Sequence, residues 1–208
     1  MHLYESNVPS GNAYKVTLLL SHLGIDHQKT TLDITATPSE SRSAEFLAIN
    51  PNGRIPVLVL DNGVALAESN AIIYYLASGT RFFPEDRLES TQVLQWLFFE
   101  QNTHEPYVAV YKWCKFWGGF GIRDEADTKR RGQEALGTME VHLGGGGGRK
   151  WFVGERYTIA DIALYGYTCT AECSGFEIGE NVRGWLERVE AEQGYVRLKK
   201  DPLGKCPY

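Results

Sequence analysis

Strand patterns stop at residue 66 of this 208-residue chain, and beyond residue 80 the apolar residues recur only at helical spacing. Sheets and helices must each bury an apolar face, so a mixed first part and a purely helical second part call for two cores. Two domains of this size can each bury roughly 60 to 70 % of their unfolded surface. We predict an α/β domain over residues 1–79, a linker over 80–86 and an all-helical domain over 87–208.

The first part alternates strands with helices and then closes with a hairpin and a last helix. The predicted strands cover residues 2–8, 27–32, 55–60 and 64–66, and the predicted helices run from the 9–12 turn to Gly24, over 40–48, and from Glu68–Ser69 to Gly79. Asp61-Asn62-Gly63 is the tight turn of the hairpin. Gly24 and Gly79 are typical helix stop signals.

Four helices are expected in the second part. They cover about 85–115, about 124–143, a segment that begins at Thr158, and a segment with Val182, Trp185, Leu186 and Val189 on one face. The five-glycine run 144–148 is expected to be a flexible loop. It lacks the Lys-Ser/Thr ending of a phosphate-binding loop.

Charge and composition exclude several classes of function. A net charge of -5 does not fit nucleic acid or an anionic membrane as the main partner. No apolar stretch reaches the ~20 residues that span a bilayer, and the first residues lack a secretion signal, so we expect a cytoplasmic protein. The four cysteines and five histidines show no metal-ligand spacing, so no bound metal is expected.

Two motifs give the chain a family resemblance. One is the strand entered through Arg54-Ile55-Pro56-Val57, followed by a helix that Glu68-Ser69 opens. The other is Trp151, Gly154, Thr158, Ala160 and Asp161 in the pattern W-x-x-G-x-x-x-T-x-A-D. In this order, the motifs resemble those of cytosolic glutathione transferases. The resemblance implies a thioredoxin-like domain with a four-stranded mixed sheet, a helical-bundle domain, glutathione as cosubstrate and a homodimer.

Thr158 and Asp161 have a structural interpretation of their own. Their spacing is that of a capping box, in which the hydroxyl and the carboxylate each satisfy a free backbone amide at the start of a helix. We therefore expect them to stabilise the fold.

The resemblance assigns the glutathione-binding residues. It implies a cis bond before Pro56, with the backbone of Ile55 pairing with the cysteinyl residue of glutathione; a trans proline on an edge strand is the alternative. Glu68 and Ser69 would hold the γ-glutamyl end at a helix N-terminus, unless they only cap the helix. Arg42, with Arg54 as the second candidate, would meet the glycyl carboxylate, although surface arginines are common.

The thiol-activating group is expected at the start of the first helix. A thiol of pKa ~8.5 is about 3 % ionised at pH 7, and one or two charge-assisted hydrogen bonds supply the ~2.7 kcal/mol that lowers the pKa by two units. Ser10 and Asn12 are the donors there, so we predict a serine or asparagine type; capping alone is the other interpretation. Tyr4 lies inside the first strand, and no cysteine precedes Cys114.

Aromatic residues crowd the far end of the long helix. Such stripes usually pack a core, but the resemblance implies an electrophile pocket here, which we assign to Tyr107, Tyr111 and Trp117. The expected activity is conjugation of glutathione to a hydrophobic, aromatic electrophile. The alternatives are glutathione-dependent disulfide or peroxide reduction without a protein cysteine, and a non-catalytic interaction module.

Overall fold

The first part of the chain folds around a four-stranded mixed sheet, as predicted. The computed structural model describes residues 1–121 and 123–206. The strands β1 (His2–Ser6), β2 (Gln28–Leu32), β3 (Val57–Val59) and β4 (Ala65–Ala67) stand in the order β2-β1-β3-β4. β1 is parallel to β2, and the pairs β1–β3 and β3–β4 are antiparallel. This is the thioredoxin-like arrangement.

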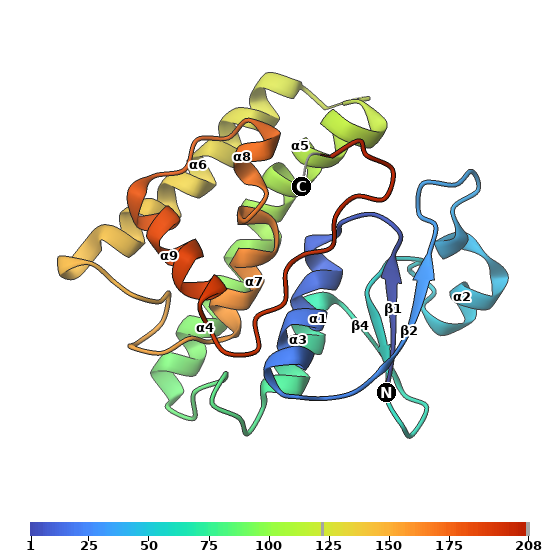
Figure 1. Ribbon diagram of the computed structural model, residues 1–208, viewed down its shortest axis with the longest axis horizontal. Helices are drawn as coiled ribbons and strands as arrows, with labels where there is room; N and C mark the ends of the chain where they lie inside the picture. The colour runs from blue at the N-terminus through green and yellow to red at the C-terminus, as the bar shows by residue number, and fades with distance from the viewer. Residues whose placement is uncertain (122, 207–208) are drawn as a thin grey trace.

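Helices cover both faces of the sheet. In Figure 1, α1 (Gly11–His22) and α3 (Ser69–Ala77) lie between the sheet and the helical part of the molecule, and α2 (Ala44–Ile49) lies on the far side. α1 buries a continuous apolar stripe that includes Leu18, Leu19 and Leu20. The start of α1 lies at the junction between the two parts, since Gly11 packs against Gly166 and Tyr167.

Several predicted boundaries were too long. The third strand begins at Val57 rather than at residue 55, since Pro56 has no N–H to donate to a ladder. The helix predicted over 40–48 divides into a 3-10 turn, Glu40–Arg42, and α2. Ser43 separates the two segments because it takes an extended backbone conformation, and its hydroxyl caps α2 by accepting from the N–H of Phe46.

The second part is a helical bundle, also as predicted. Its helices are α4 (Arg87–Phe99), α5 (Glu105–Trp113), α6 (Glu125–Gly144), α7 (Ile159–Thr168), α8 (Ala171–Ser174) and α9 (Glu180–Glu190). The short α8 was not predicted. Every residue of α7 is buried, so this helix forms the centre of the bundle. The glycine run closes α6 and makes a 3-10 turn, Gly145–Gly147.

The single helix predicted over 85–115 is interrupted by a π-helical turn at Glu100–His104, and a second π turn, Cys114–Gly118, follows α5. Pro106 explains the first turn: it has no N–H for the carbonyl four residues earlier, and its ring would clash with that carbonyl. A π turn widens the helix and rotates the side chains that follow. This rotation therefore affects which side chains of α5 face the sheet domain.

The two parts pack tightly where α1 crosses α7. A Cβ atom on Gly11 would lie 2.5 Å from the carbonyl oxygen of Gly166 and 2.7 Å from the ring of Tyr167, so only glycine fits there. After α9 the chain returns along α1 (Figure 1), where the hydroxyl of Tyr14 donates to the carbonyl of Val196 at 2.6 Å. No helix among the described residues is long and apolar enough to cross a membrane.

Candidate functional site in the cleft between the sheet and the helices

A cleft of about 530 Å³ opens between the sheet domain and α5. It brings together every residue that we predicted for glutathione binding and thiol activation, namely Ser10, Asn12, Arg42, Arg54, Ile55, Pro56, Glu68 and Ser69. A cavity of about 560 Å³ lies on the other side of α1, under the returning C-terminal segment, and of these residues only Ser10 borders it. The cleft is therefore the candidate site.

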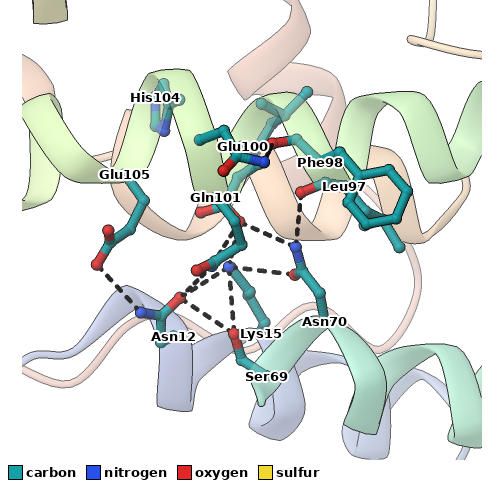
Figure 2. A network of polar contacts seen from close by, with 12 residues as sticks. Asn12, Lys15, Ser69, Asn70, Leu97, Phe98, Glu100, Gln101, His104 and Glu105 are labelled. Atoms are coloured by element: carbon teal, nitrogen blue, oxygen red, sulfur yellow. Dashed lines mark hydrogen bonds and ion pairs between the residues drawn. The ribbon is translucent and has the colours of Figure 1, made fainter.

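Asn12, the second residue of α1, forms the centre of a polar network in the floor of the cleft (Figure 2). Its Oδ1 accepts hydrogen bonds from Lys15 Nζ at 2.8 Å, Ser69 Oγ at 3.1 Å and Gln101 Nε2 at 3.2 Å. Its Nδ2 donates to Glu105 Oε1 at 3.3 Å. The amide oxygen therefore faces the protein interior, and the amide nitrogen faces a carboxylate that borders the cleft.

Ser10 is the N-cap of α1. Its backbone is extended, and its hydroxyl oxygen accepts from the N–H of Ala13 at 3.4 Å. Ser10 thus caps α1, which was one of the two interpretations of this residue. It does not exclude a second role, because the hydroxyl proton is not used in the cap and Ser10 borders the cleft.

Glu68 and Ser69 mark the start of α3. Glu68 has a φ of 68°, which is uncommon for residues other than glycine. Such a strained backbone conformation is often found at functional sites. Ser69 is buried, and its hydroxyl donates to Asn12 Oδ1 at 3.1 Å. The backbone N–H of Ser69 has no partner within the helix and is the group at this position that an anion can use.

The peptide bond between Ile55 and Pro56 is cis. Arg42 and Arg54 lie exposed at the same end of the cleft, and Arg42 Nη1 donates to the carbonyl of Asn52 at 3.1 Å. The lining of the cleft thus contains two guanidinium groups as well as the start of α3.

The aromatic lining differs from the prediction. Trp117 borders the cleft, but Tyr107 and Tyr111 do not. Tyr111 is buried against Phe176 and Phe120, and the hydroxyl of Tyr107 accepts from Arg131 of α6. That face of α5 packs against α6, so our choice of face was wrong for these two tyrosines.

Trp113 takes the place of the two tyrosines in the wall of the cleft. It stacks on Trp117 with ring centroids 5.5 Å apart. The four-residue spacing of the two tryptophans is the sequence signal for this pair, and it was visible in the aromatic cluster.

Tyr167 of α7 also borders the cleft and was not predicted. Its hydroxyl lies within hydrogen-bonding reach of the Ser10 side chain and the Asn12 backbone N–H, and burial raises its pKa, so the phenol stays protonated. Its sequence neighbours gave no signal beyond helical periodicity. The Gly11–Gly166 contact lets its ring approach α1.

Two charges lie directly under the cleft. Lys15 Nζ and Glu100 Oε2 are 2.7 Å apart, and neither side chain is exposed.

The ion pair lies near two further titratable residues, and it affects their protonation. Burial, and then the nearby Glu100 charge, raise the pKa of Glu105. Burial and the Lys15 charge lower the pKa of His104 to about 3, so this imidazole is neutral near pH 7.

None of the described cysteines borders the cleft, and no group of three or more His, Cys, Asp or Glu side chains in that part of the chain could hold a metal ion.

Comparisons with known proteins agree with this architecture. Residues 9–78 match the model of the glutathione S-transferase N-terminal domain, and residues 122–193 match that of the C-terminal domain. A glutathione S-transferase from Pseudomonas fluorescens is 40 % identical, with a TM-score of 0.86 over 95 % of this chain and 98 % of that chain.

Two further relatives are more distant. A glutathione transferase from Pseudomonas putida, solved with one glutathione disulfide bound per subunit, is 25 % identical, with a TM-score of 0.78 over 93 % of this chain and 87 % of that chain. The transcriptional regulator URE2 of Saccharomyces cerevisiae is 26 % identical over 80 % of this chain, which spans 58 % of that protein.

Proposed function

Because this chain belongs to the glutathione S-transferase family, we propose that it binds glutathione in the cleft and transfers the thiolate to a hydrophobic, aromatic electrophile. The observation that carries the proposal is the convergence of Asn12, the Ser69 N–H, the Ile55–Pro56 backbone and two arginines on one cleft. The relative from Pseudomonas putida was solved with glutathione disulfide, which fits a ligand of this chemistry.

In this proposal the tripeptide lies across the edge of the sheet. Its γ-glutamyl carboxylate meets the N–H at the start of α3, its cysteinyl backbone pairs with Ile55, and its glycyl carboxylate meets Arg42 and Arg54. The order matches the distribution of charge in the cleft, since an unpaired helix N-terminus and guanidinium groups both attract carboxylates.

The sulfur would then lie at the opening of α1. The S–H bond breaks and the proton leaves to solvent, while the Ser10 hydroxyl and the Asn12 amide donate hydrogen bonds to the thiolate. The thiolate attacks the electrophilic carbon, an S–C bond forms, and the leaving group departs with its electron pair. The protein lowers the thiol pKa and aligns the two reactants.

The electrophile is assigned to the wall formed by Trp113 and Trp117. Two stacked indoles offer a flat apolar surface to an aromatic acceptor. Tyr107 and Tyr111 are no longer part of the proposed pocket, because they pack away from the cleft.

Disulfide reduction by bound glutathione is the second candidate, and the bound glutathione disulfide in the Pseudomonas putida relative favours it. Parallel assays with chloro-dinitrobenzene and hydroxyethyl disulfide separate the two reactions. Higher kcat/KM with the first compound supports conjugation, and activity confined to the second assigns the protein as a reductase.

A non-catalytic interaction module is the third candidate, since one relative is named a transcriptional regulator. Thermal unfolding with and without glutathione tests it. Glutathione at 100 times its dissociation constant stabilises a protein by about 2.7 kcal/mol, which raises the Tm of a chain of this size by roughly 5 to 11 °C. An unchanged Tm up to millimolar glutathione would favour the interaction module.

We also propose a homodimer that uses the exposed faces of α3 and α4. Tyr75 of α3 and Leu88 and Phe98 of α4 are 52 %, 67 % and 65 % exposed, and several large exposed apolar side chains on two helices fit a protein–protein interface. Phe98→Glu is expected to convert the dimer to a monomer in analytical ultracentrifugation, because it places two charges in a self-complementary interface. Val141→Glu on α6, where Val141 is 76 % exposed, is the control and should leave the mass unchanged. A wild-type monomer at micromolar concentration would contradict the dimer.

A further inference from the structure

The fully buried ion pair of Lys15 and Glu100 is not explained by stability alone. Taking two charges out of water costs several kcal/mol per ion, and replacing such a pair by apolar residues is often neutral or stabilising. A buried pair therefore calls for a role in geometry or function, and this pair joins the first helix of the sheet domain to the helical bundle.

The contacts of Lys15 point to that role. Nζ lies 2.8 Å from Asn12 Oδ1 and 3.4 Å from Ser69 Oγ, so one ammonium group contacts a first-turn residue of each of the two helices whose starts border the cleft. Its remaining contact besides Glu100 is Asn70 Oδ1 at 3.3 Å. The charge is thus directed at the residues proposed to hold the thiol end and the γ-glutamyl end of glutathione.

Glu100 holds the network from the other side. Its Oε2 accepts from Lys15 at 2.7 Å, from Gln101 Nε2 at 2.8 Å and from Asn70 Nδ2 at 3.1 Å (Figure 2). Glu100 and Gln101 belong to the π turn that precedes Pro106. The interruption of the long helix is what presents both side chains to α1.

This network determines which way the Asn12 amide points. An amide oxygen is an acceptor and an amide nitrogen is a donor, and three donors converge on the inner atom of this side chain. A rotated amide would place its N–H groups against an ammonium group, so the rotated state is strongly disfavoured.

We propose that Lys15, held in place by Glu100, is a positioning residue that keeps the Asn12 amide oxygen inward and its nitrogen toward the cleft. In that orientation one N–H of the amide donates to the Glu105 carboxylate, and the other can donate to a thiolate, whereas the rotated amide would present a carbonyl oxygen and repel it. The inference rests on the proposed function, since it concerns the same sulfur.

The test is the pKa of the glutathione thiol bound to the protein, followed by the ultraviolet absorbance of the thiolate as the pH is varied. The double variant Lys15→Met/Glu100→Gln removes both charges together, which avoids an unpaired buried ion. Loss of an oriented charge-assisted hydrogen bond is expected to raise the pKa of the bound thiol by about one unit. At a pH below the pKa, the protein would then hold roughly tenfold less thiolate.

The Asn12→Ala background distinguishes positioning from a general loss of structure. If Lys15 acts through Asn12, the double variant adds no further rise once the amide is gone. Gln101→Leu removes one donor to Asn12 and one donor to Glu100 but keeps both charges of the ion pair, and it should raise the pKa in the same direction by a smaller amount. This variant keeps the test independent of how well the double variant folds.

Three results would overturn the inference. One is an unchanged bound thiol pKa in both the double variant and Gln101→Leu. Another is an equal rise in the Asn12→Ala background, which would mean that the charges act without the amide. The third is a wild-type protein that shows no bound thiolate at any pH, and this result, visible before any substitution is made, would overturn the proposed function as well.

Discussion

Asn12→Ala is expected to lower kcat/KM for conjugation by about 10- to 150-fold, the largest loss among single substitutions in the cleft. A charge-assisted hydrogen bond contributes about 1.5 to 3 kcal/mol, and each 1.36 kcal/mol is a factor of ten in rate. The bound thiol pKa should rise together with the loss of rate, which steady-state kinetics and the thiolate absorbance measure separately.

Asn62→Ala is the matched control for this substitution. Asn62 lies exposed in the β3–β4 turn, where its Oδ1 accepts from the N–H of Val64, and it is remote from the cleft residues. The control should retain wild-type kinetics. If Ser10→Ala removed most of the activity and Asn12→Ala removed little, the serine hydroxyl would be the principal donor instead.

Asp161→Ala is expected to be the most destabilising substitution considered, with a loss of about 3 kcal/mol or more. The buried carboxylate accepts from the N–H of Thr158 at 2.9 Å, the N–H of Phe152 at 3.1 Å and Trp185 Nε1 at 3.0 Å. Alanine leaves these buried donors without a partner, and each costs about 1 to 3 kcal/mol. The Tm should fall by roughly 6 to 12 °C, measured by calorimetry.

Asp86→Ala provides the comparison, because Asp86 caps α4 at the surface. Its Oδ1 accepts from the N–H groups of Leu88 and Glu89 at 2.9 Å each, but water can replace it there. Its loss should cost about 1 kcal/mol. Equal losses for the two variants would mean that Asp161 is only a helix cap and does not join the α7 start to Phe152 and α9.

The capping box shows which contacts of a residue can be predicted from its sequence neighbours and which cannot. Thr158 and Asp161 were predicted as a cap from their spacing, and the structure confirms both reciprocal bonds. Burial raises the pKa of Asp161 to about 6, despite the donors around it. The contacts with Phe152 and Trp185 had no local signal, because those residues meet Asp161 only after the bundle has formed.

The long second-domain helix shows where periodicity misleads. A continuous helix was predicted through Pro106, although a proline inside a helix signals a break. The π turn that results shifts the faces of the helix. The shift removes Tyr107 and Tyr111 from the cleft and brings Gln101 and Glu105 into it.

The sequence by itself determined the two-part fold, and its resemblance to glutathione transferases pointed to the residues that border the sheet side of the cleft. Turns, caps and prolines act between near neighbours, so Ser10, Asn12, Pro56 and Ser69 could be located before any packing was known. Only the tertiary structure decided which side of α5 faces the cleft and that Lys15 meets Glu100, which is 85 positions away. Helical periodicity is the same for either side of a helix, and a buried charge finds its partner only when two helices pack together.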